Sequence, residues 1–308
     1  MKKQRITQGK FTWMYFQGRE ETDKAVIVSL GTSDHDRMSK AAAKYLTSLG
    51  CDVVTLAPVL AGGKYDGWHR FPLESYEEIA GWLAKQGVQK IAVAGGSTTG
   101  MISLVAASYI PDISLALIFT GCDFLFEGFL MHQKKGKRVE VPAHGQSPLT
   151  WRGAEIPFSP YNLDDKTYHT MTYGSEKIYG ELYSIPLFEH VEKQADFSRG
   201  LIPVENAQAR IVMFGAKDDT LWTTTKYMER IEKRLQDKDY AYGFEKHIYE
   251  YGTHFVFPQG IMKGIIPCPG LIRFFVGKMF KSGKAHAKEC EATREDIDRH
   301  VRSAISRW

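Results

Sequence analysis

The sequence contains no long hydrophobic run, and no stretch approaches the roughly 18 apolar residues that a membrane-spanning helix needs. The amino terminus begins with Lys2 and Lys3, as a signal peptide often does, but the charged residues 19–21 arrive before an apolar core has formed. We therefore expect a cytoplasmic protein with no stable membrane insertion.

Cysteine is scarce, and neither sign of charge is in large excess. The four cysteines are widely spaced and form no C-x-x-C pair, which argues against a disulfide scaffold. The 40 basic and 36 acidic residues leave a net charge of +4, too small to indicate nucleic acid as the main partner. We predict no nucleic-acid partner, no metal and no cofactor, and the sequence does not indicate an oligomeric state.

Continuous apolar runs alternate with segments of helical spacing along the chain. The runs predict strands covered on both faces of a parallel sheet, at residues 25–30, 52–56, 91–94, 113–119 and 210–214, with a further strand at 244–251. Helices are expected between them at 37–49, 75–85 and 223–235. This alternation is typical of an α/β fold with a doubly wound, mostly parallel sheet, and we expect residues 1–308 to form one domain.

The two ends of the chain give more local predictions. Phe11–Phe16 is rich in aromatic residues and is expected to be an edge strand. The final helix is expected to run from Thr293 to Trp308, with Thr293 and Asp296 as a capping pair at its start. The segment 259–284 mixes apolar and basic residues, and we interpret it as core or substrate-lining structure rather than a membrane contact.

Residues 121–200 lack the regular periodicity of their flanks. A long irregular insertion within a compact domain is usually functional, and in this architecture it usually forms a cap over the active site. The basic cluster Lys134, Lys135, Lys137 and Arg138 lies in this stretch, and we interpret it as a solvated loop rather than a phosphate site.

A serine lies between one predicted strand and the helix that follows it. The sequence Gly95-Gly96-Ser97 ends the apolar run at 91–94, and small and apolar residues with helical spacing come next. This is the strand–turn–helix context of a nucleophile elbow, whose usual pattern is Gly-x-Ser-x-Gly. Gly95 fits the first position, but Thr99 occupies the second, with Gly100 one residue late. An ordinary loop or an anion-binding turn remains an alternative for the local pattern.

An acid and a histidine follow the serine in the chain order that this architecture uses. Asp218 and Asp219 lie in the loop that follows the strand at 210–214, and His254 lies in the loop after the strand at 244–251. A serine hydroxyl needs a base to take its proton, and the base needs a carboxylate to fix its tautomer. Either aspartate could instead cap the next helix, and His254 could be structural. Because the three placements agree with one mechanism, we predict a triad of Ser97, His254 and one aspartate.

An acyl-transfer site also needs donors for the oxyanion that forms in the transition state. The expected donors are the backbone N–H of Thr98 and one N–H from the loop after the strand at 25–30, at Thr32 or Ser33.

The chain resembles the catalytic α/β hydrolase domain of the acyl-CoA thioesterase and bile acid-CoA:amino acid N-acyltransferase family. The resemblance runs from about Lys24 to the carboxyl end and rests on the motifs GGSTTG, TWRGAEIPF, IPVENAQARI, DDTLW, YGTHF and GKAHAKE. It implies that Ser97 is the nucleophile and His254 the base. It favours Asp219 over Asp218 as the acid, because Asp219 keeps the family spacing to Trp222.

These observations predict a serine hydrolase whose substrate is a small-molecule acyl thioester, by resemblance an acyl-CoA, cleaved through an acyl-enzyme. Two enzymatic alternatives are a carboxylesterase and an acyl-CoA:amine N-acyltransferase. A hydrolase-fold binding protein without catalysis is the third, suggested by the threonine at the crowded elbow position.

Overall fold

The computed structural model describes residues 1–18, 21–30, 37–58, 66–134 and 137–308. Thr32 and Ser33, the expected second source of an oxyanion donor, lie outside the described residues. So does Lys135, and the same holds for the side chains of Lys134, Lys137 and Arg138.

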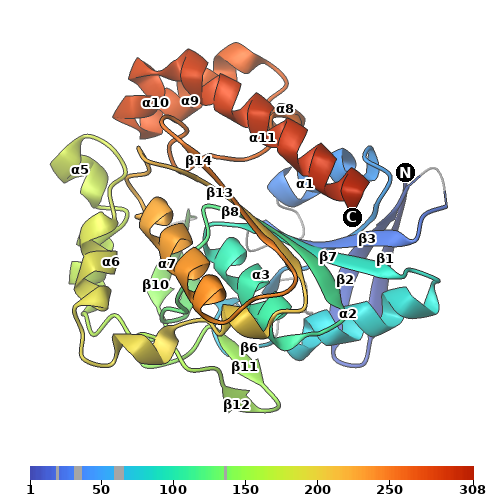
Figure 1. Ribbon diagram of the computed structural model, residues 1–308. Coiled ribbons are helices and arrows are strands. Elements are labelled where there is room, and N and C mark those ends of the chain that lie inside the picture. Colours follow the sequence, from blue (N-terminus) through green and yellow to red (C-terminus); the bar gives the residue numbers. More distant parts are fainter. Residues whose placement is uncertain (19–20, 31–36, 59–65, 135–136) are drawn as a thin grey trace.

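The centre of the molecule is a mixed sheet of eight strands, six of them parallel (Figure 1). In spatial order the strands are β1 (Lys2–Gln8), β2 (Phe11–Gln17), β4 (Asp52–Thr55), β3 (Lys24–Ser29), β7 (Lys90–Gly96), β8 (Ile113–Phe119), β13 (Arg210–Ala216) and β14 (Phe244–Tyr249). The strands from β4 to β14 run parallel, while β1 and β2 pair antiparallel with their neighbours. The predicted fold class is therefore confirmed.

Helices cover both faces of this sheet, and each face has its own hydrophobic core. One face packs against α2 (Glu74–Lys85), α3 (Thr98–Tyr109) and α7 (Thr224–Asp237). The other packs against α1 (Arg37–Thr47), α8 (Gln259–Ile265), α9 (Pro269–Met279) and α11 (Ala287–Arg307), with α10 (Lys281–Ala285) between the last two. Almost every residue of α3 is buried, as expected for a helix that is apolar all round.

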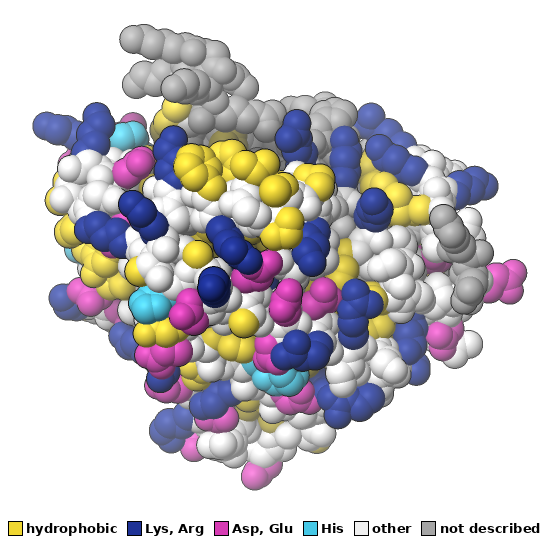
Figure 2. Space-filling model, turned by 90° about the horizontal axis from the view of Figure 1, so that it is seen from above, with side chains coloured by type: hydrophobic (Ala, Val, Ile, Leu, Met, Phe, Trp, Pro, Cys, Tyr) yellow, Lys and Arg dark blue, Asp and Glu magenta, His cyan; other side chains and the backbone are white. Residues whose placement is uncertain are grey.

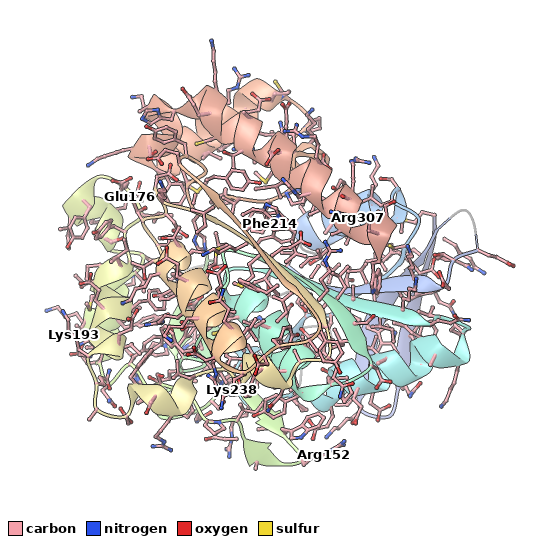
Figure 3. All side chains as sticks on the ribbon, viewed as in Figure 1. Arg152, Glu176, Lys193, Phe214, Lys238 and Arg307 are labelled. Carbon is pink, nitrogen blue, oxygen red and sulfur yellow. The ribbon has the colours of Figure 1, made fainter. Side chains whose placement is uncertain are left out.

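Phe214 is an example of the tightly packed aromatic side chains at the centre of the sheet. It lies on β13, is completely buried, and stacks on Phe119 of β8 with ring centroids 5.4 Å apart. Figure 3 shows Phe214 near the middle of the molecule among other side chains, whereas Arg152, Glu176 and Lys193 lie at its outer edge. The sheet is thus a rigid apolar platform for the loops at its strand ends.

The prediction of an edge strand at Phe11–Phe16 is wrong, because β1 lies outside it. All residues of β2 except Gln17 are buried, and β1 pairs along its whole length. The sequence of β1, KKQRITQ, is polar and mostly exposed, so it carries no hydrophobic signal for a strand. A strand rich in lysine and other polar residues is a suitable edge because it discourages pairing with other chains.

The predicted start of the last helix is also wrong. The helix α11 begins at Ala287, and the residues before Thr293 are mostly good helix formers. Thr293 and Asp296 are interior positions that bind neighbouring structure: the Thr293 hydroxyl donates to the carbonyl of Tyr251 at 2.5 Å, and Asp296 accepts from the Tyr249 hydroxyl at 2.8 Å. Their side chains hold α11 against β14 and the loop that follows it.

The stretch 121–200 contains short regular elements that its sequence did not reveal. They are the hairpin β9 (Phe129–Lys134) and β10 (Lys137–Pro142), the short strands β11 (Leu149–Trp151) and β12 (Ala154–Glu155), and the helices α4 (Asp165–Met171), α5 (Ser175–Tyr179), α6 (Ile185–Glu192) and η2 (Phe197–Gly200). A second short turn, η3 (Val204–Asn206), precedes β13. Strands β9 and β11 also pair with β5 (Gly67–Trp68) and β6 (Phe71–Pro72), so this stretch is joined to residues before the elbow.

Arg230 of α7 ties the stretch 121–200 to the helix layer. Its guanidinium donates to both carboxylate oxygens of the buried Asp123, at 2.6 and 2.5 Å, and to Glu192 at the end of α6, at 2.9 Å. Burial raises the pKa of Asp123, and the bonds from Arg230 oppose that rise. The ion pair therefore compensates a carboxylate that water cannot reach.

We expect Arg230→Met to lower the free energy of unfolding by about 3 kcal/mol, because it leaves the Asp123 charge buried without a partner. Denaturant unfolding measures this change. Lys233→Met is the matched control on the same helix, since Lys233 pairs with Asp237 at the exposed surface and its loss should cost no more than about 0.5 kcal/mol. Equal effects of the two substitutions would contradict the interpretation.

No single helix within the described ranges is long and apolar enough to cross a membrane, although α8 and α9 pass that test as a pair bent by 94°. Figure 2 looks onto the layer of α8–α11 and shows Lys and Arg side chains spread around hydrophobic ones. The exposed large hydrophobic residues of α9 are Leu271, Phe274 and Phe275, while Ile272 and Val276 are buried.

Candidate active site

Ser97 lies at the tip of a sharp turn between β7 and α3. Its backbone has φ 57° and ψ −132°, a conformation that a residue with a side chain rarely adopts. The turn is crowded, because a Cβ added at Gly95 would overlap the carbonyl of Thr99, and one at Gly96 would overlap the ring of Phe257. Strain at this position is the expected feature of a nucleophile elbow.

Thr99, the residue that departs from the usual elbow pattern, fits the turn. Its hydroxyl donates to the carbonyl of Gly96 at 2.9 Å and accepts from the N–H of Gly96 at 3.2 Å. Close contact falls instead on Gly100, where an added Cβ would lie 3.1 Å from the carbonyl oxygen of Phe119. The threonine closes the turn and does not displace Ser97.

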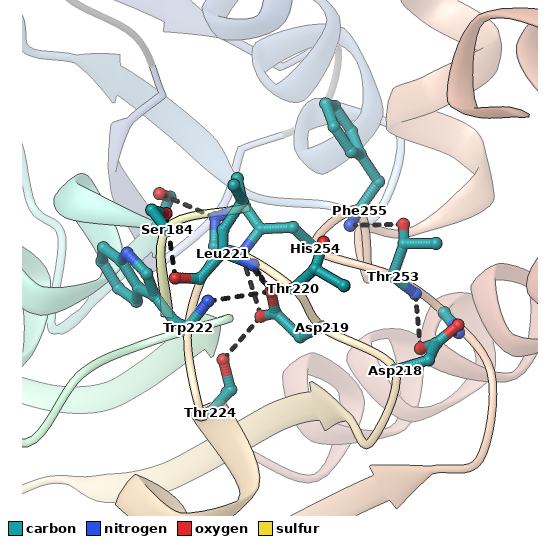
Figure 4. Close-up of polar contacts among 12 residues, drawn as sticks. Ser184, Asp218, Asp219, Thr220, Leu221, Trp222, Thr224, Thr253, His254 and Phe255 are labelled. Carbon is teal, nitrogen blue, oxygen red and sulfur yellow. Dashed lines mark hydrogen bonds and ion pairs between the residues drawn. The ribbon is translucent and has the colours of Figure 1, made fainter. Parts of the chain in front are cut away.

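His254, in the loop after β14, lies between Ser97, which follows β7, and Asp219, which follows β13. Its Nε2 lies 2.8 Å from the Ser97 hydroxyl. Its Nδ1 lies 2.9 and 3.1 Å from the two carboxylate oxygens of Asp219 (Figure 4). His254 and Asp219 are 5% and 4% exposed, so their contact is shielded from water. The ring of Trp222 meets the His254 ring edge-on, with centroids 5.4 Å apart. The imidazole is therefore held from several sides.

Asp219 also organises the loop that leads into α7. It accepts hydrogen bonds from the N–H groups of Leu221 and Trp222, at 2.9 and 3.1 Å, and from the hydroxyl of Thr224, at 2.8 Å. The sequence presented turn capping and contact with the histidine as competing interpretations, and the structure shows one carboxylate making both kinds of contact. These donors fix the direction in which Asp219 faces His254.

Asp218 points elsewhere. Its Oδ1 accepts from the N–H groups of Gly252 and Thr253, at 2.9 and 2.8 Å, and its Oδ2 accepts from Ser282 at 2.5 Å. Thr253 has a positive φ of 56°, so the turn before His254 needs such support. Asp218 thus holds the loop that carries the histidine, without contacting the histidine.

A cavity of about 190 Å³ opens beside Ser97 and Thr98. Most of its lining comes from residues 121–200, and it is rich in aromatic and aliphatic side chains, among them Phe126, Leu187 and Phe188. Sequence reasoning did not single out these residues or Glu140, because they belong to a stretch without regular periodicity. It also missed Thr224, which it placed in the predicted helix 223–235 without a role. Within the described residues, no group of three or more His, Cys, Asp or Glu side chains is placed to hold a metal ion.

The parallel sheet and the strand–turn–helix at Ser97 define an α/β hydrolase. Among solved structures, an esterase from Pyrococcus furiosus matches with a TM-score of 0.52 and 14% identity, covering 100% of this chain and 92% of its own. An esterase domain from Rhodothermus marinus matches with a TM-score of 0.45 and 12% identity over 89% and 99% of the two chains. A puromycin-hydrolysing peptidase of Mycobacterium tuberculosis matches with a TM-score of 0.48 and 14% identity over 87% of this chain, which spans 37% of the peptidase.

The chain belongs to the family described as BAAT / acyl-CoA thioester hydrolase C terminal, whose model matches residues 71–259. No curated protein sequence gives a significant match. The resemblance inferred from the sequence motifs is confirmed, and the protein is an enzyme, a hydrolase of the α/β hydrolase fold.

Proposed function

We propose that this enzyme hydrolyses acyl thioesters, with Ser97 as nucleophile, His254 as general base and Asp219 as the acid that orients the histidine. One observation carries the proposal: the continuous hydrogen-bonded chain from the Ser97 hydroxyl through the imidazole to the carboxylate. The family match supports a thioester as the substrate.

In the first step the Ser97 oxygen attacks the thioester carbonyl and its proton moves to Nε2 of His254. The carbon–sulfur bond breaks, and the imidazolium returns the proton to the leaving thiolate. Water then attacks the acyl-enzyme, with His254 again taking and returning a proton, so that an acid and free Ser97 are released. Asp219 accepts the Nδ1 hydrogen throughout and stabilises the imidazolium.

The N–H of Thr98 is the proposed first donor to the oxyanion. Thr98 is the first residue of α3, so its N–H has no acceptor within the helix, and the positive end of the helix dipole lies there. Thr32 and Ser33 remain the predicted source of the second donor.

Residues 121–200 are proposed to form the cap of a single domain. They supply most of the lining of the cavity beside Ser97, and Arg230 attaches them to α7. The cavity of about 190 Å³ is small beside the roughly 300–1,000 Å³ of sites that enclose a drug-sized ligand. We infer that it takes a short acyl group or one part of a substrate whose remainder lies outside.

A substrate panel tests the proposed function. The purified protein is assayed with acyl-CoAs from acetyl to palmitoyl and with p-nitrophenyl esters of the same acids, and thiol or phenol release is followed, with Ser97→Ala as the blank. We expect release of CoA from short acyl-CoAs. Cleavage of the esters alone would assign a carboxylesterase, and amide products formed with added glycine or taurine would assign an N-acyltransferase.

A further inference from the structure

Glu140 is a carboxylate in the cavity beside Ser97 that the proposed chemistry does not use. It lies on β10 and lines the same cavity as Ser97 and Thr98. Its two oxygens accept hydrogen bonds from the hydroxyls of Tyr168, at 2.7 Å, and Tyr173, at 2.9 Å. An aliphatic acyl chain would make no favourable contact with this carboxylate.

No cation compensates Glu140 among the described residues. It makes no ion pair there, and none of the described residues that line the cavity is Lys, Arg or His. Burial raises the pKa of Glu140, and the two tyrosine bonds oppose the rise. An apolar group placed against this carboxylate would remove its remaining water without supplying a hydrogen bond or an opposite charge. The free energy of binding such a group would therefore be unfavourable.

Aromatic residues line the cavity together with this carboxylate. Tyr161 and Tyr168 are 2% and 3% exposed, and their ring centroids are 5.0 Å apart. Phe126 stacks on Tyr161 at 5.9 Å and also lines the cavity. A carboxylate in a cavity lined by aromatic rings favours a positively charged nitrogen, because ring faces and the anion attract the same charge.

We propose that Glu140 binds an ammonium group of the substrate beside Ser97. This inference rests on the proposed function, since it assigns the substrate class to the same site. The cavity then selects in two ways: the ammonium group gains a counter-charge, and an apolar group of the same shape is disfavoured because it would strip the remaining water from a half-buried carboxylate. The ammonium group belongs to either the acyl group or the leaving group of the substrate.

Two pairs of isosteric substrates show whether the ammonium group belongs to the acyl group or to the leaving group. The p-nitrophenyl ester of β-alanine is compared with that of butanoic acid, so that an ammonium group replaces a methyl group on the acyl side. Butanoylcholine is compared with 3,3-dimethylbutyl butanoate, so that a quaternary nitrogen replaces a carbon on the alcohol side. We expect the cationic member of one pair to be preferred by at least about tenfold in kcat/KM, which corresponds to a modest buried charge contact.

Variants connect the preference to Glu140. In Glu140→Gln the preference should fall by about tenfold or more, since the amide keeps the shape of the side chain and loses its charge. Glu189→Gln is the matched control, because Glu189 is exposed on α6 and does not line the cavity. Calorimetry measures the affinity of propylammonium for Ser97→Ala and for Ser97→Ala with Glu140→Gln. We expect the affinity to be lower in the double variant, which tests the role of Glu140 in the absence of catalysis.

Labelling with a fluorophosphonate in the same preparations separates the two proposals. If Ser97 is labelled and the wild-type enzyme does not prefer the cationic member of either pair, the ammonium site is wrong and the hydrolase mechanism stands. A preference that survives in Glu140→Gln also overturns the assignment. If folded protein is not labelled at Ser97, the proposed function itself fails. Should Glu140→Gln not fold, the wild-type comparison of the two pairs still decides.

Discussion

Ser97→Ala is expected to lower kcat/KM by on the order of 10⁵- to 10⁶-fold on whichever thioester or ester the enzyme cleaves best. The substitution removes the only atom that can form the acyl-enzyme, and the remaining oxyanion donors and binding contacts give only slow hydrolysis. Steady-state kinetics at enzyme concentrations high enough to detect the residual rate measure the loss.

Ser108→Ala is the matched control for this substitution. Ser108 lies on the same helix α3 and donates to the carbonyl of Leu104 at 2.8 Å, well along the helix from the elbow. We expect its kcat/KM to stay within about twofold of wild type, since an internal helical hydroxyl contributes little. If Ser97→Ala retained most of the activity, the mechanism proposed above would be wrong.

The second large effect is expected at Asp219. Asp219→Asn should lower kcat by about 10⁴-fold, because an amide that donates a hydrogen bond to Nδ1 would hold the imidazole in the wrong tautomer to accept the Ser97 proton. The buried carboxylate already receives hydrogen bonds from Leu221, Trp222 and Thr224, so its position is fixed before substrate arrives.

Asp218→Asn provides the matched comparison one residue away. Asp218 contacts the loop before His254 rather than the ring, and its Oδ1 contacts with Gly252 and Thr253 can be kept by an asparagine oxygen. We expect kcat to fall by less than about tenfold, with the loss appearing mainly as a lower melting temperature. The reverse order of the two variants in kcat would contradict the assignment of the acid.

The serine and the two aspartates could be placed from the sequence because they follow clear apolar runs, at 91–94 and 210–214. His254 follows β14, a half-buried edge strand whose sequence, FEKHIY, contains no such run, and it was recognised by its place after the next predicted strand. Strands buried on both faces leave a strong hydrophobic signal, and the residue after each strand is thereby placed at one edge of the sheet. The sequence also indicated a crowded turn at Ser97, because Gly95 and Gly96 precede it and neither position has room for a side chain.

The choice between Asp218 and Asp219 could not be made from the residues alone. Both lie in one loop, and the direction of each side chain depends on which N–H groups the turn offers: Gly252 and Thr253 to the first, Leu221 and Trp222 to the second. Only the resemblance to the family favoured Asp219. The structural contacts agree with that preference.

Several of the elements that sequence reasoning missed have no hydrophobic pattern. The edge strand β1 is polar, and the hairpin of β9 and β10 contains a basic cluster that conceals its alternation. Glu140 lies on that hairpin, so its place beside Ser97 depends on long-range packing against α4 through Tyr168. Such contacts leave no periodic trace in the sequence.

The most direct test of the central claim is a labelling experiment on the nucleophile. The protein is treated with a fluorophosphonate, and the labelled residue is located by peptide mass spectrometry. We predict one equivalent of label on Ser97 in the wild-type protein and in Ser108→Ala, none in Ser97→Ala, and much slower labelling in Asp219→Asn. Label on a different residue, or a folded wild-type protein that takes up no label, would contradict the account.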